Sequence, residues 1–475
     1  MAAPGEVLPS TRILTLVIAS ALFMESLVST VIATSLAAMA ADLAVDPVTL
    51  KLAFTAYYVA LAIFIPISGW CADRYGAKTV FRIAIVVFTL ASIFCALAWD
   101  LNSLIAGRFF QGTGGAMMVP VGRLILLRVV PKREMVTAMA WLSIPALFAP
   151  IMGPPVGGFI TTYYHWRGIF WLNVPVGVLG LLLATLVLPQ VKAEVLRPLD
   201  LKGFCLTGFG LSLSIFGFTL AGSSADELML AFVMMSCGLA LLTLYWFHAR
   251  RTEHAIIELR LLRIPTFRVA MFAGLLFRIS IGAIPFLLPL MLQVGFGLNP
   301  FQSGSLTFVA AVGAVSMKLT AAPILRKFGF KRVLCVNAVI SSLLLAATAL
   351  FTAQTPHSII IAVLLIGGFF RSLQFTSMNT LGYADIDREE MSRATSFVAV
   401  VQQLSLSGGV AVAAILLDAF RAAEGRSELI AADFSGAFWV IGLIAIASTG
   451  MFFNLNPDAG AEVSGHRYEP DSARR

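Results

Sequence analysis

One carboxylate and three guanidinium groups stand inside stretches of sequence that are otherwise almost wholly apolar. Glu25 interrupts the run "ALFMESLVST", and Arg108, Arg278 and Arg371 interrupt three later runs. A charge at the centre of a bilayer costs roughly 2.5–3.5 kcal/mol on insertion scales, so it is kept only where a partner, a cavity or a proton relieves it. Such residues are candidates for binding a proton or a solute.

The composition indicates that these charges lie within a membrane. Hydrophobic residues make up 59% of the 475 and charged residues 12%, against about 25% charged in a soluble protein, and the mean hydropathy is +0.90. A helix needs about 20 apolar residues to cross the bilayer. We therefore predict an all-α polytopic membrane protein with transmembrane helices at roughly 13–39, 52–71, 82–99, 103–128, 136–160, 168–190, 201–222, 228–248, 268–294, 302–325, 333–353, 357–381, 394–419 and 434–454.

The basic residues predict the orientation of these fourteen helices. With the N-terminus inside, 24 Lys and Arg fall in inner loops and tails, while the outer loops hold only Lys51, Arg167, Arg421 and Arg426. Positive loops face the cytoplasm, so both termini are expected there, in a bacterial inner membrane. The net charge of +8 is thus explained by loops, and no nucleic acid partner is expected. The first apolar run lacks a signal cleavage site and is read as a retained helix.

Other chemistry finds no support in the sequence. The five cysteines show no pairing pattern, and the five histidines lie in loops, at helix ends or in the tail, so neither a disulfide framework nor a metal site is expected. No phosphate-binding loop or hydrolase motif is present. A membrane-embedded enzyme is therefore disfavoured. A non-transporting sensor stays open as a minor alternative.

An internal repeat suggests two related halves. "DRYGAKTVF" (73–81) and "RKFGFKRVL" (326–334) both carry a basic residue, an aromatic, Gly, any residue and Lys. Repeated halves are typical of secondary transporters, whose substrate site lies at the interface of the halves. The predicted domains are a six-helix bundle (1–190), two additional helices with a cytoplasmic linker (191–266), a second six-helix bundle (267–456) and a cytoplasmic tail (457–475), the tail being disordered.

Several motifs carry a resemblance to a known family. The chain resembles the major facilitator superfamily, and within it the fourteen-helix drug:proton antiporter branch of multidrug exporters. The resemblance implies the major facilitator fold, two six-helix bundles plus two extra helices. The segments that carry it are "GWCADRYGAKTVFR" (69–82), "GRFFQGTGGAMMVPVGR" (107–123), "GPPVGG" (153–158), "HWRGIFWLNVPVG" (165–177) and "PLMLQVGFG" (289–297).

The first motif supplies a candidate conformational latch, formed by Gly69, Asp73, Arg74, Gly76 and Lys78. Gly69 would permit close packing and Gly76 a tight turn, and Asp73 is an acid on a basic face. A solvated turn is the alternative. The resemblance implies that Asp73 contacts the start of the thirteenth helix, near Ser392, in one conformation only. Arg326 replaces this acid in the second copy.

The third motif predicts a close helix contact. Gly153 and Gly157 form a small-residue face, with Gly158 beside it, and Pro154 kinks the helix. Ordinary packing is one reading, and the resemblance implies a bendable antiporter seam between the halves. The family often has Gly where this chain has Ala149.

Glu25 is the candidate proton carrier. It lies about twelve residues into the first helix, ~18 Å at 1.5 Å per residue, near the midplane. Arg108 and Gln111 lie one turn apart on the fourth helix and can form a structural pair, whereas the resemblance implies that this Arg serves the helix-1 acid and the proton path. The rival account is a permanently ionised Glu25 that neutralises an Arg.

A candidate substrate cavity is formed by Gln111, Arg278, Arg371 and Gln374. Arg123 and Lys318 lie nearer the inner face and can snorkel, but Arg278 and Arg371 are too deep for that. The drug-exporting branch usually has an Asp where this chain has Val28. The excess of deep cations suits an anionic or zwitterionic solute.

We predict a proton-coupled secondary active exporter of small organic molecules, an antiporter of the multidrug-efflux type that works by alternating access. Export of an anionic metabolite or organic acid is the alternative. The expected partners are the small-molecule substrate and the lipid bilayer. No cofactor is expected, because the proton gradient supplies the energy, and the protein is expected to be a monomer.

Overall fold

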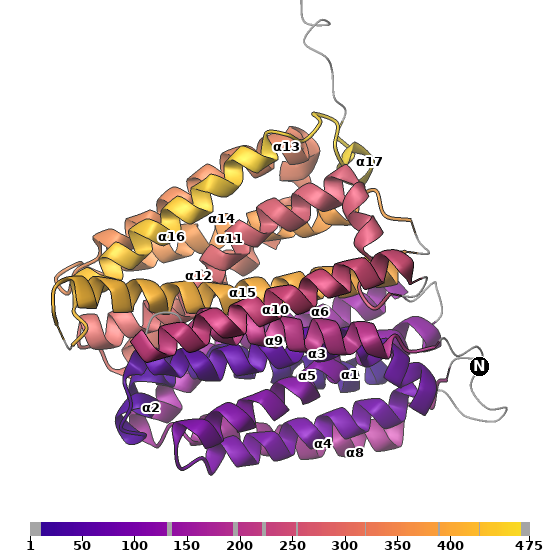
Figure 1. Cartoon of the computed structure of the whole chain (residues 1–475), viewed down its shortest axis with the longest axis horizontal. Helices are drawn as coiled ribbons and strands as arrows, with labels where there is room; N and C mark the ends of the chain where they lie inside the picture. The colour runs from indigo at the N-terminus through magenta and orange to yellow at the C-terminus, as the bar shows by residue number, and fades with distance from the viewer. Residues whose placement is uncertain are drawn as a thin grey trace, which may run out of the picture. The chain divides into compact units, whose positions relative to one another are not determined.

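The structure is a computed structural model that describes residues 11–130, 135–192, 198–220, 225–252, 255–318, 320–387, 390–426 and 428–466. These residues form long helices with short connections, as Figure 1 shows, and they contain no strand. The predicted all-α class is therefore confirmed. Two compact units divide the chain, one of Met1–Ile256 with Leu298–Ser305 and one of Ile257–Gly297 with Leu306–Arg475.

The first unit contains the helices of the N-terminal half and a long helical pair that follows them. α1 packs against α6, α5 packs against both α3 and α4, and α9 packs against α10. The elements are α1 (Thr11–Val31), η1 (Ile32–Ser35), α2 (Leu36–Asp42), η2 (Pro47–Leu50), α3 (Lys51–Tyr75), α4 (Ala77–Ala96), α5 (Leu101–Val129), α6 (Met135–Tyr163), α7 (Gly168–Trp171), α8 (Asn173–Val187), α9 (Leu201–Leu220) and α10 (Ala225–Arg251).

The second unit repeats this kind of packing. α11 packs against α14, α15 and α16, and α13 packs against α14 and α16. Its elements are η4 (Leu259–Arg263), α11 (Pro265–Leu290), η5 (Met291–Gly295), most of α12 (Pro300–Lys318), α13 (Ala321–Ala347), η6 (Thr348–Leu350), α14 (His357–Gly382), α15 (Met391–Ala423), α16 (Ala431–Phe452) and α17 (Ala461–Ser464).

Within the described residues, eleven helical segments are long and apolar enough to cross a membrane. The helices α5, α6 and α12 occupy the three other predicted positions, so the count of fourteen spans stays a prediction. The predicted segment 302–325 covers two helical pieces. α12 ends at Lys318, and 321–325 lie in the part of α13 that precedes Gly329, where φ is 70° and the helical geometry is interrupted.

Local sequence explains where α5 begins. Asp100 precedes it, and the Asp100 carboxylate accepts a hydrogen bond from the backbone of Ser103 at 2.8 Å, while the Ser103 hydroxyl satisfies the Asp100 backbone. This is a reciprocal N-terminal cap. The hydrogen bonds from the Ser103 side chain and backbone hold the pKa of Asp100 below its usual range.

The two copies of the repeated loop make the same turn. Gly76 ends α3 with φ 90°, and Gly329 has φ 70°, a conformation that L side chains rarely adopt. A Cβ atom on Gly76 would strike Gln190, and one on Gly329 would strike His466. The predicted disorder of the tail is therefore wrong up to His466, whose ring nitrogen Nδ1 lies 3.0 Å from the Arg326 carbonyl oxygen. The rest of the tail lies outside the described residues.

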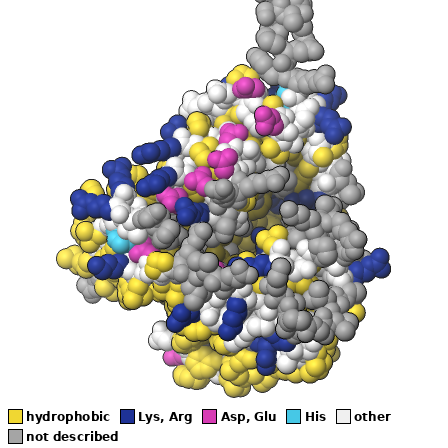
Figure 2. All heavy atoms as spheres, turned by 90° about the vertical axis from the view of Figure 1, so that its right-hand side faces the viewer, with side chains coloured by type: hydrophobic (Ala, Val, Ile, Leu, Met, Phe, Trp, Pro, Cys, Tyr) yellow, Lys and Arg dark blue, Asp and Glu magenta, His cyan; other side chains and the backbone are white. Residues whose placement is uncertain are grey.

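Apolar side chains cover the outward faces of the helices. Along α10, Leu228 is 56% exposed, Phe232 69% and Leu239 57%. On the face drawn in Figure 2, dark blue Lys and Arg side chains stand out among yellow hydrophobic ones. An apolar surface of this kind is stable against lipid rather than water, and the protein is a multi-pass membrane protein.

Candidate functional site

Glu25 lies near the middle of the helical segment Thr11–Asp42 and is half-buried. Its distance along the helix axis is about 21 Å from Thr11 and about 26 Å from Asp42 at 1.5 Å per residue. The hydroxyl of Tyr57, on α3, donates a hydrogen bond of 3.2 Å to Glu25 Oε1. The hydroxyl of Ser26 donates one of 3.4 Å to Oε2. The carboxyl group is therefore held by two neutral donors.

Arg108 lies on the other side of Tyr57 and is buried, with 1% of its surface exposed. Its guanidinium carbon lies 4.2 Å from the centre of the Tyr57 ring, which is within the range of a cation–π contact. Tyr57 thus bridges the acid and the cation. Within the described part of the chain neither Glu25 nor Arg108 forms an ion pair, so the two groups make no direct contact in this conformation.

Gln111 orients Arg108. The guanidinium Nη1 donates to Gln111 Oε1 at 2.5 Å, and Gln111 Nε2 donates to the Ser92 hydroxyl of α4 at 2.7 Å. Arg108 Nε is buried without a hydrogen-bond partner. The predicted structural pair of Arg108 and Gln111 is present, and it leaves part of the guanidinium unsatisfied.

Two glycines of α5 let these groups come together. A Cβ atom on Gly112 would lie 2.5 Å from the Tyr57 carbonyl oxygen, and one on Gly115 would lie 3.4 Å from Glu25 Cγ and 3.5 Å from the Tyr57 hydroxyl. Larger side chains would push α5 away from α3. The sequence analysis did not identify Tyr57, because its role depends on contacts with Glu25 of α1 and Arg108 of α5.

The second unit contains the other predicted cavity residues, and it repeats the Arg-x-x-Gln spacing. Arg371 and Gln374 stand on α14 as Arg108 and Gln111 stand on α5. Gln374 is fully buried. Its Oε1 accepts from Asn337 Nδ2 at 2.8 Å, and its Nε2 donates to the Leu334 carbonyl at 3.2 Å. Gln374 therefore fastens α14 to α13 rather than lining a cavity.

Arg371 has no such partner. It is half-buried at the middle of α14 and makes no hydrogen bond or ion pair with any described residue. Arg278, at the middle of α11, is fully buried. Its Nη2 donates to Asn379 Oδ1 at 2.7 Å, whereas its Nε and Nη1 have no partner. Arg123 and Lys318 have exposed side chains, and Lys318 Nζ donates to the Thr376 hydroxyl at 2.9 Å.

The predicted seam residues make close backbone contacts within the first unit. A Cβ atom on Gly153 would collide with the Thr30 side chain, and one on Gly157 would lie 2.5 Å from the Val31 carbonyl oxygen. Both contacts join α6 to the helix of Glu25. Gly158 packs against Pro300, and the Pro154 carbonyl against Gly304, both on residues of α12 that belong to the same unit. The bendable role of this seam stays a prediction.

The predicted latch residues lie at the turn between α3 and α4. Arg128 Nη2 donates to Asp73 Oδ1 at 2.7 Å, and both side chains are about one-third exposed. Arg74 is exposed. The Lys78 backbone nitrogen donates to Gln190. The Ser392 side chain lies outside the described residues, so the latch stays a prediction. Our expectation for Gly69 is wrong, because no atom lies within 4 Å of an added Cβ there.

The comparisons with known proteins agree with the motifs and with the helical fold. The sequence model of the Major Facilitator Superfamily matches residues 18–410 and 270–473. The chain belongs to this superfamily. Two relatives are described as "Putative multidrug resistance protein MdtD". The one from Serratia proteamaculans (strain 568) is 37% identical over 407 residues, 85% of this chain and 84% of that protein. The one from Cronobacter sakazakii (strain ATCC BAA-894) is 36% identical over 455 residues, 93% and 94%.

A solved structure supports the fold. The crystal structure of a D-xylose-proton symporter matches with a TM-score of 0.68 at 13% identity, covering 94% of this chain and 98% of that one. At this identity the likeness concerns the fold alone.

In this superfamily member, the "HWRG" motif is a clamp around Asp42 at the end of α2. Trp166 Nε1 donates to Asp42 Oδ2 at 3.0 Å, and Arg167 Nη1 donates to the same oxygen. Arg167 Nη2 also donates to the Ala98 carbonyl at 2.7 Å. The clamp ties three connections of the first unit together, and no solute contact is needed to explain it.

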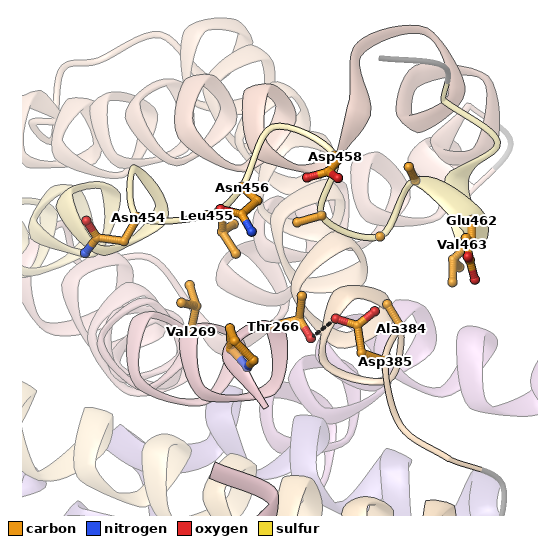
Figure 3. A pocket seen from close by; sticks show the side chains of 14 residues that line it. Thr266, Val269, Ala384, Asp385, Asn454, Leu455, Asn456, Asp458, Glu462 and Val463 are labelled. Atoms are coloured by element: carbon orange, nitrogen blue, oxygen red, sulfur yellow. Dashed lines mark hydrogen bonds between the residues drawn. The ribbon is translucent and has the colours of Figure 1, made fainter. Parts of the chain in front are cut away.

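A pocket of about 490 Å³ opens in the second unit where α11 begins and where α14 and α16 end. Figure 3 shows Thr266 donating to Asp385, a hydrogen bond of 2.6 Å, with Asp458 and Glu462 on the chain after α16. None of the predicted site residues lines it. In the described part of the chain no three His, Cys, Asp or Glu side chains gather as a metal site.

Proposed function

We propose that this transporter is a proton-coupled antiporter that exports small organic molecules of the multidrug type by alternating access. Membership of the superfamily makes it a transporter, and the description of its relatives supports the multidrug class. The observation that supports proton coupling is the Glu25 site. The Glu25 carboxyl group sits at mid-helix, hydrogen-bonded to Tyr57 and separated by the Tyr57 ring from the buried cation Arg108.

Each group has a part in the proposed proton step. The Tyr57 hydroxyl donates to the ionised carboxylate and rotates to accept from the protonated one, since a phenol does both. Gln111 and the Tyr57 ring hold Arg108 away from Glu25, so the carboxyl carries a proton without competition from the cation. When a conformational change brings the guanidinium to Glu25, the Coulomb attraction favours the carboxylate and the proton leaves.

The wider setting of the proposal follows from the loops and the helices. We place the protein in a bacterial inner membrane with both termini in the cytoplasm, because basic residues dominate the predicted inner loops. The lipid bilayer and the exported solute are the proposed partners, with no nucleic acid. The proposed protein acts as a monomer, driven by the proton gradient without a cofactor.

The test replaces the carboxyl group with its neutral isostere. We expect Glu25→Gln in proteoliposomes to accumulate tetraphenylphosphonium or 2-naphthoate under an imposed proton gradient at least tenfold less than the wild type. Exchange of preloaded probe without a gradient should persist. The matched control is Glu428→Gln, which removes the same charge at an exposed position between α15 and α16.

Two results would count against this proposal. Full uphill transport by Glu25→Gln would show that another group carries the proton. Loss of folded protein in Glu25→Gln, with Glu428→Gln normal, would favour the account in which a permanently ionised Glu25 neutralises Arg108 for stability.

A further inference from the structure

Two cations in the middle of the second unit are not neutralised by any carboxylate that the structure describes. Arg278 is the fourteenth of 26 residues of α11, and Arg371 is the fifteenth of 26 residues of α14. Arg278 has one neutral partner, the Asn379 amide oxygen, and leaves Nε and Nη1 unpaired. Arg371 makes no hydrogen bond or ion pair with the described residues.

The acids of this unit lie elsewhere. Every described carboxylate stands in a connection or near a helix end, and several are already bound: Glu258 to Arg393, Asp385 to Thr266, Asp418 to Arg421 and Asp433 to Arg426. The remaining described acids are Asp387, Glu390, Glu424, Glu428, Asp458 and Glu462. None is placed at mid-helix, so the deep positive charge is left uncompensated by the described residues.

The two arginines belong to one face formed by α11 and α14, which pack against each other. Arg371, Phe375 and Asn379 are spaced by four residues and so line one side of α14. Arg278 reaches this side from α11, with its guanidinium carbon 5.7 Å from the Phe375 ring centre and its Nη2 on Asn379. Lys318 Nζ donates to Thr376, the residue after Phe375, from an exposed position at the end of α12.

Glycines leave room for both guanidinium groups. A Cβ atom on Gly274 would lie 2.6 Å from Arg278 Nη1, and one on Gly367 would lie 3.3 Å from Arg371 Nη1. Each glycine stands one turn before its arginine. Because the glycine has no side chain, the guanidinium group can lie close to the helix backbone at that position.

A buried or half-buried guanidinium without a counter-charge raises the free energy of the folded protein, and pairing it with an anion lowers that free energy. A planar carboxylate or sulfonate fits the guanidinium fork with two parallel hydrogen bonds. The Phe375 ring beside it offers apolar contact for the body of an organic molecule. The complementary ligand is therefore an organic anion with an aromatic or aliphatic body.

We propose that the face of α11 and α14 binds the anionic group of the transported solute. Arg371 makes the direct contact, and Arg278, still bound to Asn379, contributes the charge behind Phe375. This inference rests on the proposed transport function and names the charge of its substrate class, which differs from a lipophilic cation.

Binding without any gradient tests the site directly. The full chain in phosphatidylcholine nanodiscs is titrated with radiolabelled 2-naphthoate, with 5-carboxyfluorescein and with the neutral 2-naphthamide. We expect Arg371→Gln to weaken binding of at least one anion tenfold or more, with 2-naphthamide unchanged, and Arg371→Lys to recover part of the loss. The matched control is Arg332→Gln, which removes an exposed cation from α13 and should leave every affinity unchanged.

The outcomes separate this inference from the proposed function. Equal anion binding by the wild type and Arg371→Gln, or no measurable binding of either anion by the wild type, overturns the anion site. An equal loss of 2-naphthamide binding also overturns it, because the charge would not be what is recognised. Glu25→Gln nanodiscs should bind the anions normally. If they do while Glu25→Gln also keeps full proton-driven transport, the proton proposal alone fails.

Discussion

The pattern Arg-x-x-Gln occurs in the first half of α5 and again at the middle of α14, and the two copies have different partners. In α5, the side-chain carbonyl oxygen of Gln111 accepts a hydrogen bond from Arg108, and its amide nitrogen donates one to Ser92. In α14, the side-chain carbonyl oxygen of Gln374 accepts a hydrogen bond from Asn337 instead, and Arg371 makes no hydrogen bond to it. A donor on the neighbouring helix therefore decides whether the arginine is held or available.

The residue after each glutamine widens the difference. Gly112 follows Gln111, so the backbone of α3 comes close and Tyr57 reaches Arg108. Phe375 follows Gln374 and fills the corresponding place with a ring that lies under Arg278. One copy thus places a cation beside an acid, separated by a phenol, and the other places cations with no acid beside them in the described part of the chain. The motif alone specifies neither arrangement.

The largest effect is expected from giving the first copy the bulk of the second. Gly112→Val places a Cβ atom 2.5 Å from the Tyr57 carbonyl oxygen, where backbone must move. Overpacking of this kind costs about 1–3 kcal/mol or more, so we expect little folded protein in size-exclusion chromatography. Gly69→Val, where no atom lies within 4 Å of the added Cβ, should fold normally. A normal yield of Gly112→Val would show that α5 and α3 are not closely packed.

A smaller effect is expected from removing the Tyr57 hydroxyl group, which lies between the acid Glu25 and the cation Arg108. Tyr57→Phe keeps the ring under Arg108 and removes the hydroxyl that donates to Glu25. Hydrogen bonds to charged groups contribute about 1.5–3 kcal/mol, so we expect proton-driven uphill transport to fall about tenfold, with gradient-free exchange retained and a changed pH profile. Tyr58→Phe is the matched control, since Tyr58 is the adjacent buried tyrosine. Equal behaviour of the two variants would remove Tyr57 from the proton path.

Composition and motif order were enough to predict the all-helical class and the superfamily. The extreme hydropathy leaves few alternatives, and the loop signature needs Gly76 in a conformation that other residues avoid. The helix ends were less predictable, because the segment after Lys318 is apolar enough to continue α12, whereas α12 ends there and 321–325 lie in the part of α13 that precedes the turn at Gly329.

The site was predictable as a set of residues and unpredictable as a set of contacts. Deep charges stand out in an apolar sequence, which identified Glu25, Arg108, Arg278 and Arg371. Tyr57 did not stand out, because a tyrosine is unexceptional in a membrane helix. Its role depends on two other helices reaching it. The assignment of Gln374 failed for the same reason, since nothing in its own helix predicts that Asn337 of α13 would bind it.

The smallest effect is expected where the second copy is given the acid it lacks. Asn379→Asp replaces the side-chain amide, whose oxygen accepts a hydrogen bond from Arg278 Nη2 at 2.7 Å, with a carboxylate. A charge-assisted pair is stronger than a bond to a neutral amide, and we expect a gain of about 1 kcal/mol, the spacing between neutral and charged hydrogen bonds. The apparent unfolding temperature should rise by a few degrees, as read by tryptophan fluorescence.

The same substitution should compete with the solute. An internal carboxylate on Arg278 neutralises the charge behind Phe375, so 2-naphthoate binding should weaken about fivefold, which corresponds to ~1 kcal/mol at 1.4 kcal/mol per tenfold. Asn454→Asp, at an exposed position after α16, adds the same charge away from the arginines and should change neither quantity.

A more stable Asn379→Asp that binds 2-naphthoate as well as the wild type would mean that Arg278 plays no part in anion binding, and Arg371 would then be the sole charge of the site. An Asn379→Asp variant with neither change would mean that Arg278 is already neutralised, and the contrast between the two copies would reduce to their packing.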